Sequence, residues 1–376
     1  MYINVNNLVR VNIVNPPDSH KTNLANEFHF IKKQLPLDNN EEIQVIFKSN
    51  LKFNRKQAVD VSAPIGYDKD GVFWYDPSDR IARIDFAGFS STTTTIICDY
   101  NFNRHFLFKI IEYLLSAKLI QKDGIYIHAS AVRYKGKTIL FPAWRHVGKT
   151  NLMLQMIRSG AEFIADDGVF LFKDGYILPY SKQVHLLYFN IASFPELLKY
   201  LDPGMIKLMK FIRNSRKGLY QVNTDLITKM QKMIRVRIKK DNLFSENQTV
   251  GLPSTGTSIA NEDNPVSLKL DAVFYLSKNF IENNNTLPDM FLNQLTLESL
   301  VTKNTAITMF EQSHLHTAYR AYAFITGTKE ELLHEFELRT HEIANVGFGN
   351  IKELFEICFD NHLDNDKATK LILRSL

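Results

Sequence analysis

Short runs of apolar residues, separated by turns rich in Asp, Asn and Pro, recur over residues 1 to about 100. Two of these runs, Ile43–Phe47 and Gly71–Tyr75, have the length and the β-branched and aromatic content of strands. We therefore predict a β-rich N-terminal region over residues 1–105. Apolar residues then recur at helical spacing over Phe106–Lys118, which predicts a helix leading into a second region, 106–376.

The middle of the chain has the pattern of strand, turn, strand, loop and helix. The apolar run Gly124–Val132 predicts one strand, and Tyr134–Lys137 predicts a hairpin turn. Thr138–Pro142 predicts a buried strand, and the helical spacing of Asn151–Arg158 ends at Gly160, a residue suited to a helix C-cap. This order predicts a mixed α/β fold in which a loop joins a buried strand to a helix.

That loop follows the phosphate-loop pattern G-x-x-x-x-G-K-[S/T], except that Ala143 replaces the first glycine. Backbone N–H groups of such a loop bind phosphate oxygens because they are unpaired donors at the positive end of a helix dipole. Lys149 would reach the terminal phosphates, and the Thr150 hydroxyl would bind Mg²⁺. The residues that we expect to form this nucleotide site are Ala143, Arg145, His146, Val147, Gly148, Lys149 and Thr150.

Two large basic residues, Arg145 and His146, stand inside the loop, where small residues would leave the backbone free to wrap a phosphate. They have two interpretations. They add positive charge beside the phosphates, or they mark a loop that has lost its ligand. A Gly-Lys-Thr triplet alone is also common where a helix starts after a turn.

Adjacent carboxylates, Asp166 and Asp167, stand between two apolar runs, where unpaired charges are costly. A Mg²⁺ ion held by Thr150 and one of the aspartates, with the other accepting a proton from an attacking hydroxyl, would be the minimal apparatus for phosphoryl transfer. The alternative is an Asp-Asp-Gly turn within a hairpin. Upstream, His128 lies in the strand that precedes the hairpin and the loop. Taken alone, it is more typical of a hydrogen-bonded core histidine.

The motifs Ile127–Val132, the hairpin, the loop ending in Gly-Lys-Thr and Ala165–Val169 together resemble HPr kinase/phosphorylase and its kinase-like relatives. That family has a nucleotide fold similar to phosphoenolpyruvate carboxykinase. The match covers residues 124–182 in the same order and spacing. This chain departs from the family, which usually has glycine or serine, at Ala143, Arg145 and His146. No counterpart of the family's later acidic signature or distal arginine is identified.

The resemblance implies that ATP and Mg²⁺ are bound through Lys149 and Thr150. It also implies that Asp166 transfers a proton together with His128, and that Asp167 binds the metal with Thr150. The expected function is an ATP-dependent kinase acting on a hydroxyl, by resemblance a peptide or protein serine. A sugar, a small metabolite or an RNA hydroxyl remains an alternative acceptor. A non-catalytic nucleotide-binding regulatory protein and a pseudoenzyme without nucleotide are the competing classes.

A basic insertion is predicted over residues 190–265. Residues 207–240 carry eleven lysines and arginines against one acid, and their apolar residues have helical spacing. This pattern predicts two basic amphipathic helices joined near 214–221, followed by a polar loop over 246–264. Most often, such a basic face is simply solvated. The functional alternative is that it binds an acidic substrate, a nucleic acid or an anionic membrane.

Composition excludes several classes. The net charge is +5, and two cysteines provide neither a disulfide framework nor a cysteine metal site. No apolar stretch approaches the roughly 18 residues of a membrane helix, and the N-terminus lacks a signal-peptide core, so we expect a cytoplasmic protein. The sequence leaves the oligomeric state open. Three further predictions concern the C-terminal part: a core strand at Leu268–Ser277, a turn at Gly347–Gly349 and a helix at Lys352–Phe359. His314 and His316 predict a surface pair, or a weak metal chelate on a strand.

Overall fold

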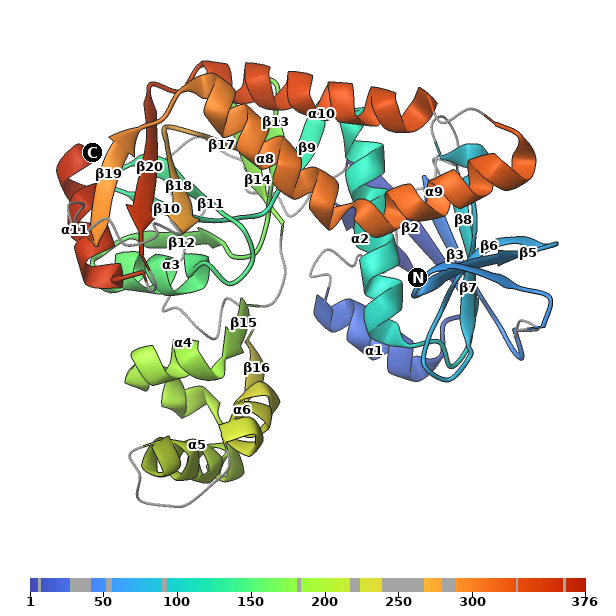
Figure 1. The fold of residues 1–376 in the computed structure, drawn as a ribbon, viewed down its shortest axis with the longest axis horizontal. Coiled ribbons are helices and arrows are strands. Elements are labelled where there is room, and N and C mark those ends of the chain that lie inside the picture. The colour runs from blue at the N-terminus through green and yellow to red at the C-terminus, as the bar shows by residue number, and fades with distance from the viewer. Residues whose placement is uncertain are drawn as a thin grey trace.

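Four β-sheets and the helices packed on them make up the described part of the chain, as a computed structural model shows (Figure 1). The described residues are 1–5, 8–27, 42–51, 56–89, 93–180, 184–216, 224–238, 267–278, 289–328, 331–360 and 363–376. The protein is mixed α/β, as the sequence predicts. Among the described helices, none is long and apolar enough to cross a membrane.

Residues 2–99 contribute every strand of an eight-stranded sheet with the order β1-β2-β3-β8-β7-β6-β5-β4. The strands are β1 (Tyr2–Val5), β2 (Val9–Val14), β3 (Ile43–Lys48), β4 (Val59–Ser62), β5 (Ile65–Asp68), β6 (Gly71–Tyr75), β7 (Ile81–Asp85) and β8 (Thr94–Asp99). Buried residues alternate along β2 and β3, so one face of the sheet is covered. Helix α2 (Arg104–Ile120) packs on β2 and on α1 (Asp18–Glu27). The predicted strands within 43–47 and 71–75 and the predicted helix within 106–118 are confirmed.

A six-stranded sheet with the order β12-β10-β11-β18-β20-β19 carries the predicted phosphate loop. Its strands are β10 (Ala129–Tyr134), β11 (Lys137–Pro142), β12 (Glu162–Ala165), β18 (Ala272–Lys278), β19 (Met290–Gln294) and β20 (Glu353–Phe359). Strands β11, β18 and β20 run parallel, and α3 (Lys149–Arg158) and α11 (Asn365–Ser375) pack together beside them. The hairpin, the buried strand and the helix that the sequence predicts are confirmed. The loop therefore lies at the carboxyl end of a parallel strand, the edge at which open α/β sheets bind ligands.

A four-stranded sheet with the order β17-β14-β13-β9 lies between the two larger ones. Its strands are β9 (Gly124–Ile127), β13 (Val169–Phe172), β14 (Tyr176–Pro179) and β17 (Leu268–Lys269). Three helices follow at the C-terminal end: α8 (Leu297–Glu311), α9 (Ser313–Thr326) and α10 (Glu331–Gly349). Helices α8 and α10 pack on each other and on β9, whereas α9 packs on β5 and β6 of the eight-stranded sheet. Figure 1 shows α8, α9 and α10 running across the molecule between its two ends, with α2 upright beside the eight-stranded sheet.

The predicted strand over 124–132 is broken at His128. Strand β9 before the break joins the four-stranded sheet, and β10 after it joins the six-stranded sheet. Similarly, the predicted core strand over 268–277 is divided into β17 and β18, which belong to the same two sheets. A continuous apolar run does not reveal such a change of partner. The break places His128 at the junction of two sheets.

Two C-terminal predictions are wrong. Glu353–Phe359 forms strand β20, not a helix, because it fills the position between β18 and β19. Residues 347–349 end helix α10 and do not form a turn. Gly347 is needed there, because a Cβ would lie 2.7 Å from the Phe172 carbonyl oxygen of β13. His314 and His316 lie on helix α9, where residues two apart face different directions, so the alternative of a strand chelate does not apply. His314 is exposed and His316 is half-buried.

The basic insertion contains two helices, α5 (Pro203–Arg216) and α6 (Thr224–Met233), as the sequence predicts. They follow α4 (Tyr188–Ser193) and a 3₁₀ helix (Pro195–Tyr200), and a two-stranded antiparallel sheet of β15 (Val184–Leu187) and β16 (Arg235–Ile238) connects them to the core. Arg235 and Arg237 therefore belong to a strand. The predicted polar loop over 246–264 lies outside the described residues. Figure 1 shows the insertion projecting from the six-stranded sheet on the α3 side.

Candidate functional site

The phosphate-loop sequence forms a left-handed turn between β11 and α3. His146 has φ +62° and Gly148 has φ +114°, and the helix begins at Lys149. Gly148 is the N-cap residue and has no side chain that could accept from the N–H groups of the first turn. These donors lie at the positive end of the helix dipole, which is the arrangement that binds anions.

Replacing Gly148 with alanine should destabilise the protein and disrupt the loop. The backbone at φ +114° is unfavourable for any residue with a Cβ, and that Cβ would lie 3.2 Å from Leu363 Cδ2. We expect a loss of about 1–3 kcal/mol in unfolding free energy together with weaker ATP binding. Gly136→Ala is the matched control. Gly136 also has a positive φ, +83°, but no atom lies within 4 Å of the position that its Cβ would take. Thermal unfolding and ATP titration of both variants test this, and equal ATP affinities would contradict it.

The Lys149 side chain is buried and folds back over the loop. Its Nζ donates to the carbonyl oxygens of Ala143 at 3.0 Å and Trp144 at 2.9 Å. Burial lowers the pKa of Lys149 to about 8, although the carboxylates of Asp167, Asp166 and Glu311 oppose this shift. The ammonium group is thus disfavoured by burial, and phosphate oxygens would stabilise it.

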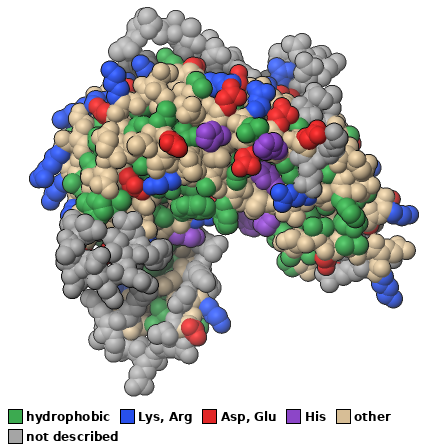
Figure 2. Space-filling model, turned by 45° about the horizontal axis from the view of Figure 1, so that its top comes forward, with side chains coloured by type: hydrophobic (Ala, Val, Ile, Leu, Met, Phe, Trp, Pro, Cys, Tyr) green, Lys and Arg blue, Asp and Glu red, His purple; other side chains and the backbone are tan. Residues whose placement is uncertain are grey.

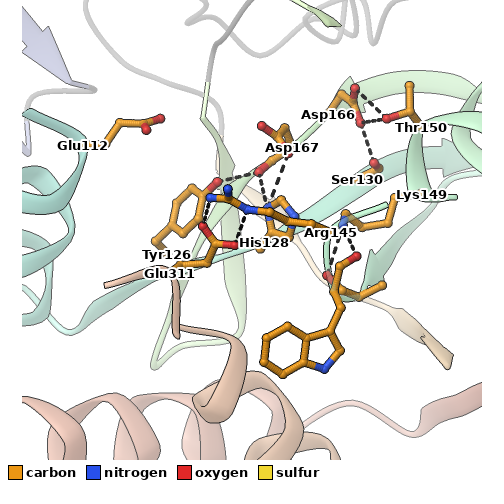
Figure 3. A network of polar contacts seen from close by, with 12 residues as sticks. Glu112, Tyr126, His128, Ser130, Arg145, Lys149, Thr150, Asp166, Asp167 and Glu311 are labelled. Atoms are coloured by element: carbon orange, nitrogen blue, oxygen red, sulfur yellow. Dashed lines mark hydrogen bonds and ion pairs between the residues drawn. The ribbon is translucent and has the colours of Figure 1, made fainter. Parts of the chain in front are cut away.

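Asp166 is a buried carboxylate that joins β12 to the loop (Figure 3). Its Oδ1 accepts from Ser130 Oγ at 2.6 Å, and both of its oxygens are 3.1 Å from Thr150 Oγ1. Burial and the nearby charge of Asp167 raise the pKa of Asp166 to about 6, against the hydrogen bonds from the two hydroxyls. Ser130 was not predicted from the sequence, although it lies only two residues after His128.

His128 contacts the second aspartate. Its Nδ1 is 3.1 Å from the Asp167 carbonyl oxygen and 3.5 Å from Asp167 Oδ1, and the Tyr126 hydroxyl donates to the same carbonyl. Burial and the Lys149 charge lower the pKa of His128 to about 4, so the ring is neutral at pH 7. Because Nδ1 faces a carbonyl oxygen, we assign the proton to Nδ1, which leaves Nε2 as an acceptor.

The Asp-Asp-Gly segment does not form a hairpin turn. Strand β12 before it belongs to the six-stranded sheet and β13 after it to the four-stranded sheet, so the segment crosses between sheets. Asp167 has φ +66°, and a Cβ on Gly168 would lie 2.4 Å from the Tyr126 ring. The positive φ of Asp167 and the close approach of the Tyr126 ring to Gly168 constrain the backbone of this segment. The two carboxylates point in different directions. Asp166 points to Thr150, whereas Asp167 lies beside His128 (Figure 3).

These contacts differ from the pairing that the resemblance implies. The resemblance combines Asp166 with His128 for proton transfer and Asp167 with Thr150 for the metal, whereas the hydrogen bonds join Asp166 to Thr150 and His128 to Asp167. Within the described residues, no group of three or more His, Cys, Asp and Glu side chains could hold a metal ion by itself. A Mg²⁺ ion at this site would therefore be held by Thr150, one carboxylate and the phosphates of a nucleotide, as is usual for Mg²⁺.

Arg145 extends away from the loop toward the end of α8. Its Nε donates to Glu311 Oε1 at 2.6 Å, and a second guanidinium nitrogen contacts Glu311 Oε2. Figure 3 shows the guanidinium joined to Glu311 and drawn in front of His128, and its charge interacts with His128 and Asp167. The arginine therefore adds positive charge to the site without filling the loop. Glu311 was not predicted, because nothing in the local sequence distinguishes it from other helical glutamates.

A cleft of ≈ 1040 Å³ opens on the outer side of the loop. Its wall combines loop residues with α4 of the insertion, the ends of β18 and β20, and residues near the start of α11. His146 and Trp144 are exposed in it, and the Trp144 ring lies edge-on to Phe310 at 5.4 Å. Ligand pockets commonly measure about 300–1,000 Å³, so the base and ribose of a nucleotide would fit here.

Comparison of the sequence with models of known protein families and with curated protein sequences gave no match. The resemblance to HPr kinase/phosphorylase thus depends on the motif residues between 124 and 182. A functional conclusion must come from the geometry of those residues.

Proposed function

We propose that this protein is an ATP-dependent kinase that transfers the γ-phosphoryl group to a hydroxyl. The observation that supports this most strongly is the convergence of Lys149, Thr150 and Asp166 at one end of the parallel strands, with His128 and Asp167 beside them. The first three residues are the types that bind phosphates and Mg²⁺, and the last two can accept a proton. A structural helix start would not require a buried lysine within the electrostatic reach of two aspartates.

The contacts favour a division of roles that is the reverse of the one implied by the resemblance. Thr150 and buried Asp166 would hold Mg²⁺, which would neutralise charge on the phosphates. Asp167, which is 46 % exposed, is accessible to an acceptor and lies against neutral His128. The acceptor O–H gives its proton to the Asp167 carboxylate, which His128 orients. The acceptor oxygen bonds to the γ-phosphorus while the bond from that phosphorus to the β–γ bridging oxygen breaks, releasing ADP.

The acceptor chemistry is proposed from the resemblance as a peptide or protein serine. Sugars, small metabolites and RNA provide the alternative hydroxyls. Lys207, Lys210, Arg213 and Lys229 of α5 and α6 are exposed and would attract an acidic acceptor or a nucleic acid. On the face in Figure 2, by contrast, acidic and basic side chains are interspersed over the surface. A cytoplasmic location, where ATP is abundant, belongs to the same proposal.

A transfer assay tests the proposal. With [γ-³²P]ATP and Mg²⁺, we expect label to move to a hydroxyl in one of four acceptor pools: serine peptides, proteins, sugars or RNA. Asp167→Asn should lose transfer by roughly 100-fold or more, the range for removal of a general base, while retaining Mg²⁺-dependent ATP binding. Loss of Mg²⁺ dependence in Asp167→Asn would instead support the pairing implied by the resemblance.

The alternative function is a nucleotide-binding regulatory protein. The ion pair that fixes Arg145 favours it, because a loop held in one position is also suited to binding without turnover. Tight ATP binding with neither transfer to any acceptor pool nor ATP hydrolysis would select this alternative.

A further inference from the structure

Glu311 is a buried carboxylate at the phosphate site. It is the last residue of α8, and its side chain is 8 % exposed, whereas that of its partner Arg145 is 48 % exposed. Its negative charge acts on Lys149, His128 and Tyr126. Glu311 is therefore close enough to influence Lys149 and His128, although it is distant from them in sequence.

The Arg145–Glu311 pair compensates this charge. A buried carboxylate without a cation is strongly unfavourable, and the planar guanidinium binds both carboxylate oxygens at once. The same contact determines where Arg145 points. Within the described residues, the side-chain hydrogen bonds of Arg145 go to Glu311. Without Glu311, the guanidinium could fold over the loop that must receive phosphate.

We propose that Glu311 is a positioning residue that holds Arg145 on the acceptor side of the phosphate loop. This inference rests on the proposed kinase function. Held there, Arg145 supplies a fixed cation beside Asp167, where the phosphoryl group passes to the acceptor, and leaves the loop N–H groups open to the nucleotide. In return, Arg145 cancels the charge of Glu311, which would otherwise repel the phosphates bound by Lys149.

The experiment combines Arg145→Gln, Glu311→Gln and the double variant, with ATP·Mg²⁺ titration, transfer kinetics and thermal unfolding. Arg145→Gln leaves Glu311 uncompensated, so the ATP Kd should rise by roughly tenfold or more, as expected when one partner of a buried pair is removed. In the double variant no net charge remains, and the Kd should return to within about threefold of the wild-type value by the same argument. Glu311→Gln should leave the Kd near wild type or tighter, but should lower turnover about tenfold because Arg145 is no longer held.

Arg145→Lys separates charge from geometry. Lysine restores the positive charge but not the two-point contact, so ATP affinity should recover while turnover remains low. The matched control is Arg83→Gln. Arg83 contacts Asp68 through two nitrogens at 2.7 and 2.6 Å in the N-terminal sheet, and both side chains are largely buried. This variant should lower the melting temperature without changing the ATP Kd.

Two results would overturn the inference: equal ATP affinities for Arg145→Gln and the double variant, or unchanged turnover in Glu311→Gln. Either result leaves the kinase proposal intact if wild-type protein still binds ATP and transfers phosphate. Absence of ATP binding in the wild type would instead refute the proposed function, and the inference with it. If Arg145→Gln does not fold, Arg145→Lys and Glu311→Gln still test the inference, because wild-type turnover in either variant would overturn it.

Discussion

Replacing Asp166 with asparagine should make the protein more stable while abolishing phosphoryl transfer. Burial and the neighbouring Asp167 raise the pKa of Asp166 from 3.8 to about 6. A change of this size in the pKa corresponds to roughly 3 kcal/mol of unfolding free energy at neutral pH. This is the upper limit of the stabilisation, because asparagine also loses hydrogen bonds from Ser130 and Thr150. In the proposed mechanism Asp166 would hold Mg²⁺ beside the phosphates, so its loss should reduce turnover by roughly 100-fold or more.

The pH dependence gives this prediction a specific signature. Asp166 holds its proton up to about pH 6 when folded but releases it near pH 3.8 when unfolded. The folded state therefore binds more protons between these values, and its stability falls as the pH rises through this window. The advantage of Asp166→Asn should be small near pH 4 and complete above pH 6.

Thermal unfolding of the wild type and the variant between pH 4 and 7, in EDTA, measures this advantage. Asp60→Asn is the matched control, because Asp60 is an exposed carboxylate of β4 in the eight-stranded sheet and its replacement should not produce a comparable gain. If the wild type is as stable as Asp166→Asn above pH 6, the ionised Asp166 carboxylate does not destabilise the folded protein, and the prediction is wrong.

Replacing Lys149 with methionine should weaken ATP·Mg²⁺ binding by roughly 100-fold, near the upper end of the range for hydrogen bonds to charged groups. Stability should change little, because methionine keeps most of the apolar stem and removes a buried ammonium group whose pKa is lowered to about 8, while it loses the hydrogen bonds to Ala143 and Trp144. ATP titration and thermal unfolding of the same samples measure the two effects.

Lys210→Met is the control for the Lys149 variant. Lys210 is an exposed lysine of α5, and its replacement should change neither stability nor ATP affinity. If Lys149→Met bound ATP within threefold of the wild type, the lysine would have no phosphate to bind. If Lys210→Met lost affinity instead, nucleotide would be bound by the basic insertion.

The sequence was sufficient to predict the parts of the site that are local in the chain. The loop from Ala143 to Thr150, the strand before it and the helix after it follow from apolar spacing and from the positions of Gly148 and Lys149. The two helices of the basic insertion were predicted for the same reason, because their apolar residues recur at helical spacing. Each of these elements has a pattern that its own residues determine.

The contacts that assemble the site were not predictable in this way. The break at His128 depends on β13 pairing with β9, while β12 pairs with β10. Glu311 reaches Arg145 only because α8 crosses β9 and ends beside the loop. The seven residues of β20 fit the apolar pattern of a helix as well as that of a buried strand. In so short a run, periodicity alone does not distinguish the two elements. In each case the deciding partner is distant in the chain.

Whether this loop binds the phosphates of a nucleotide can be measured by isothermal titration of the wild-type protein with ATP in the presence of Mg²⁺. We expect saturable binding at one site, strong loss of binding in Lys149→Met, and no comparable binding of adenosine, which lacks phosphates. No heat of binding in the wild type, together with a melting temperature that millimolar ATP·Mg²⁺ does not raise, would contradict this expectation.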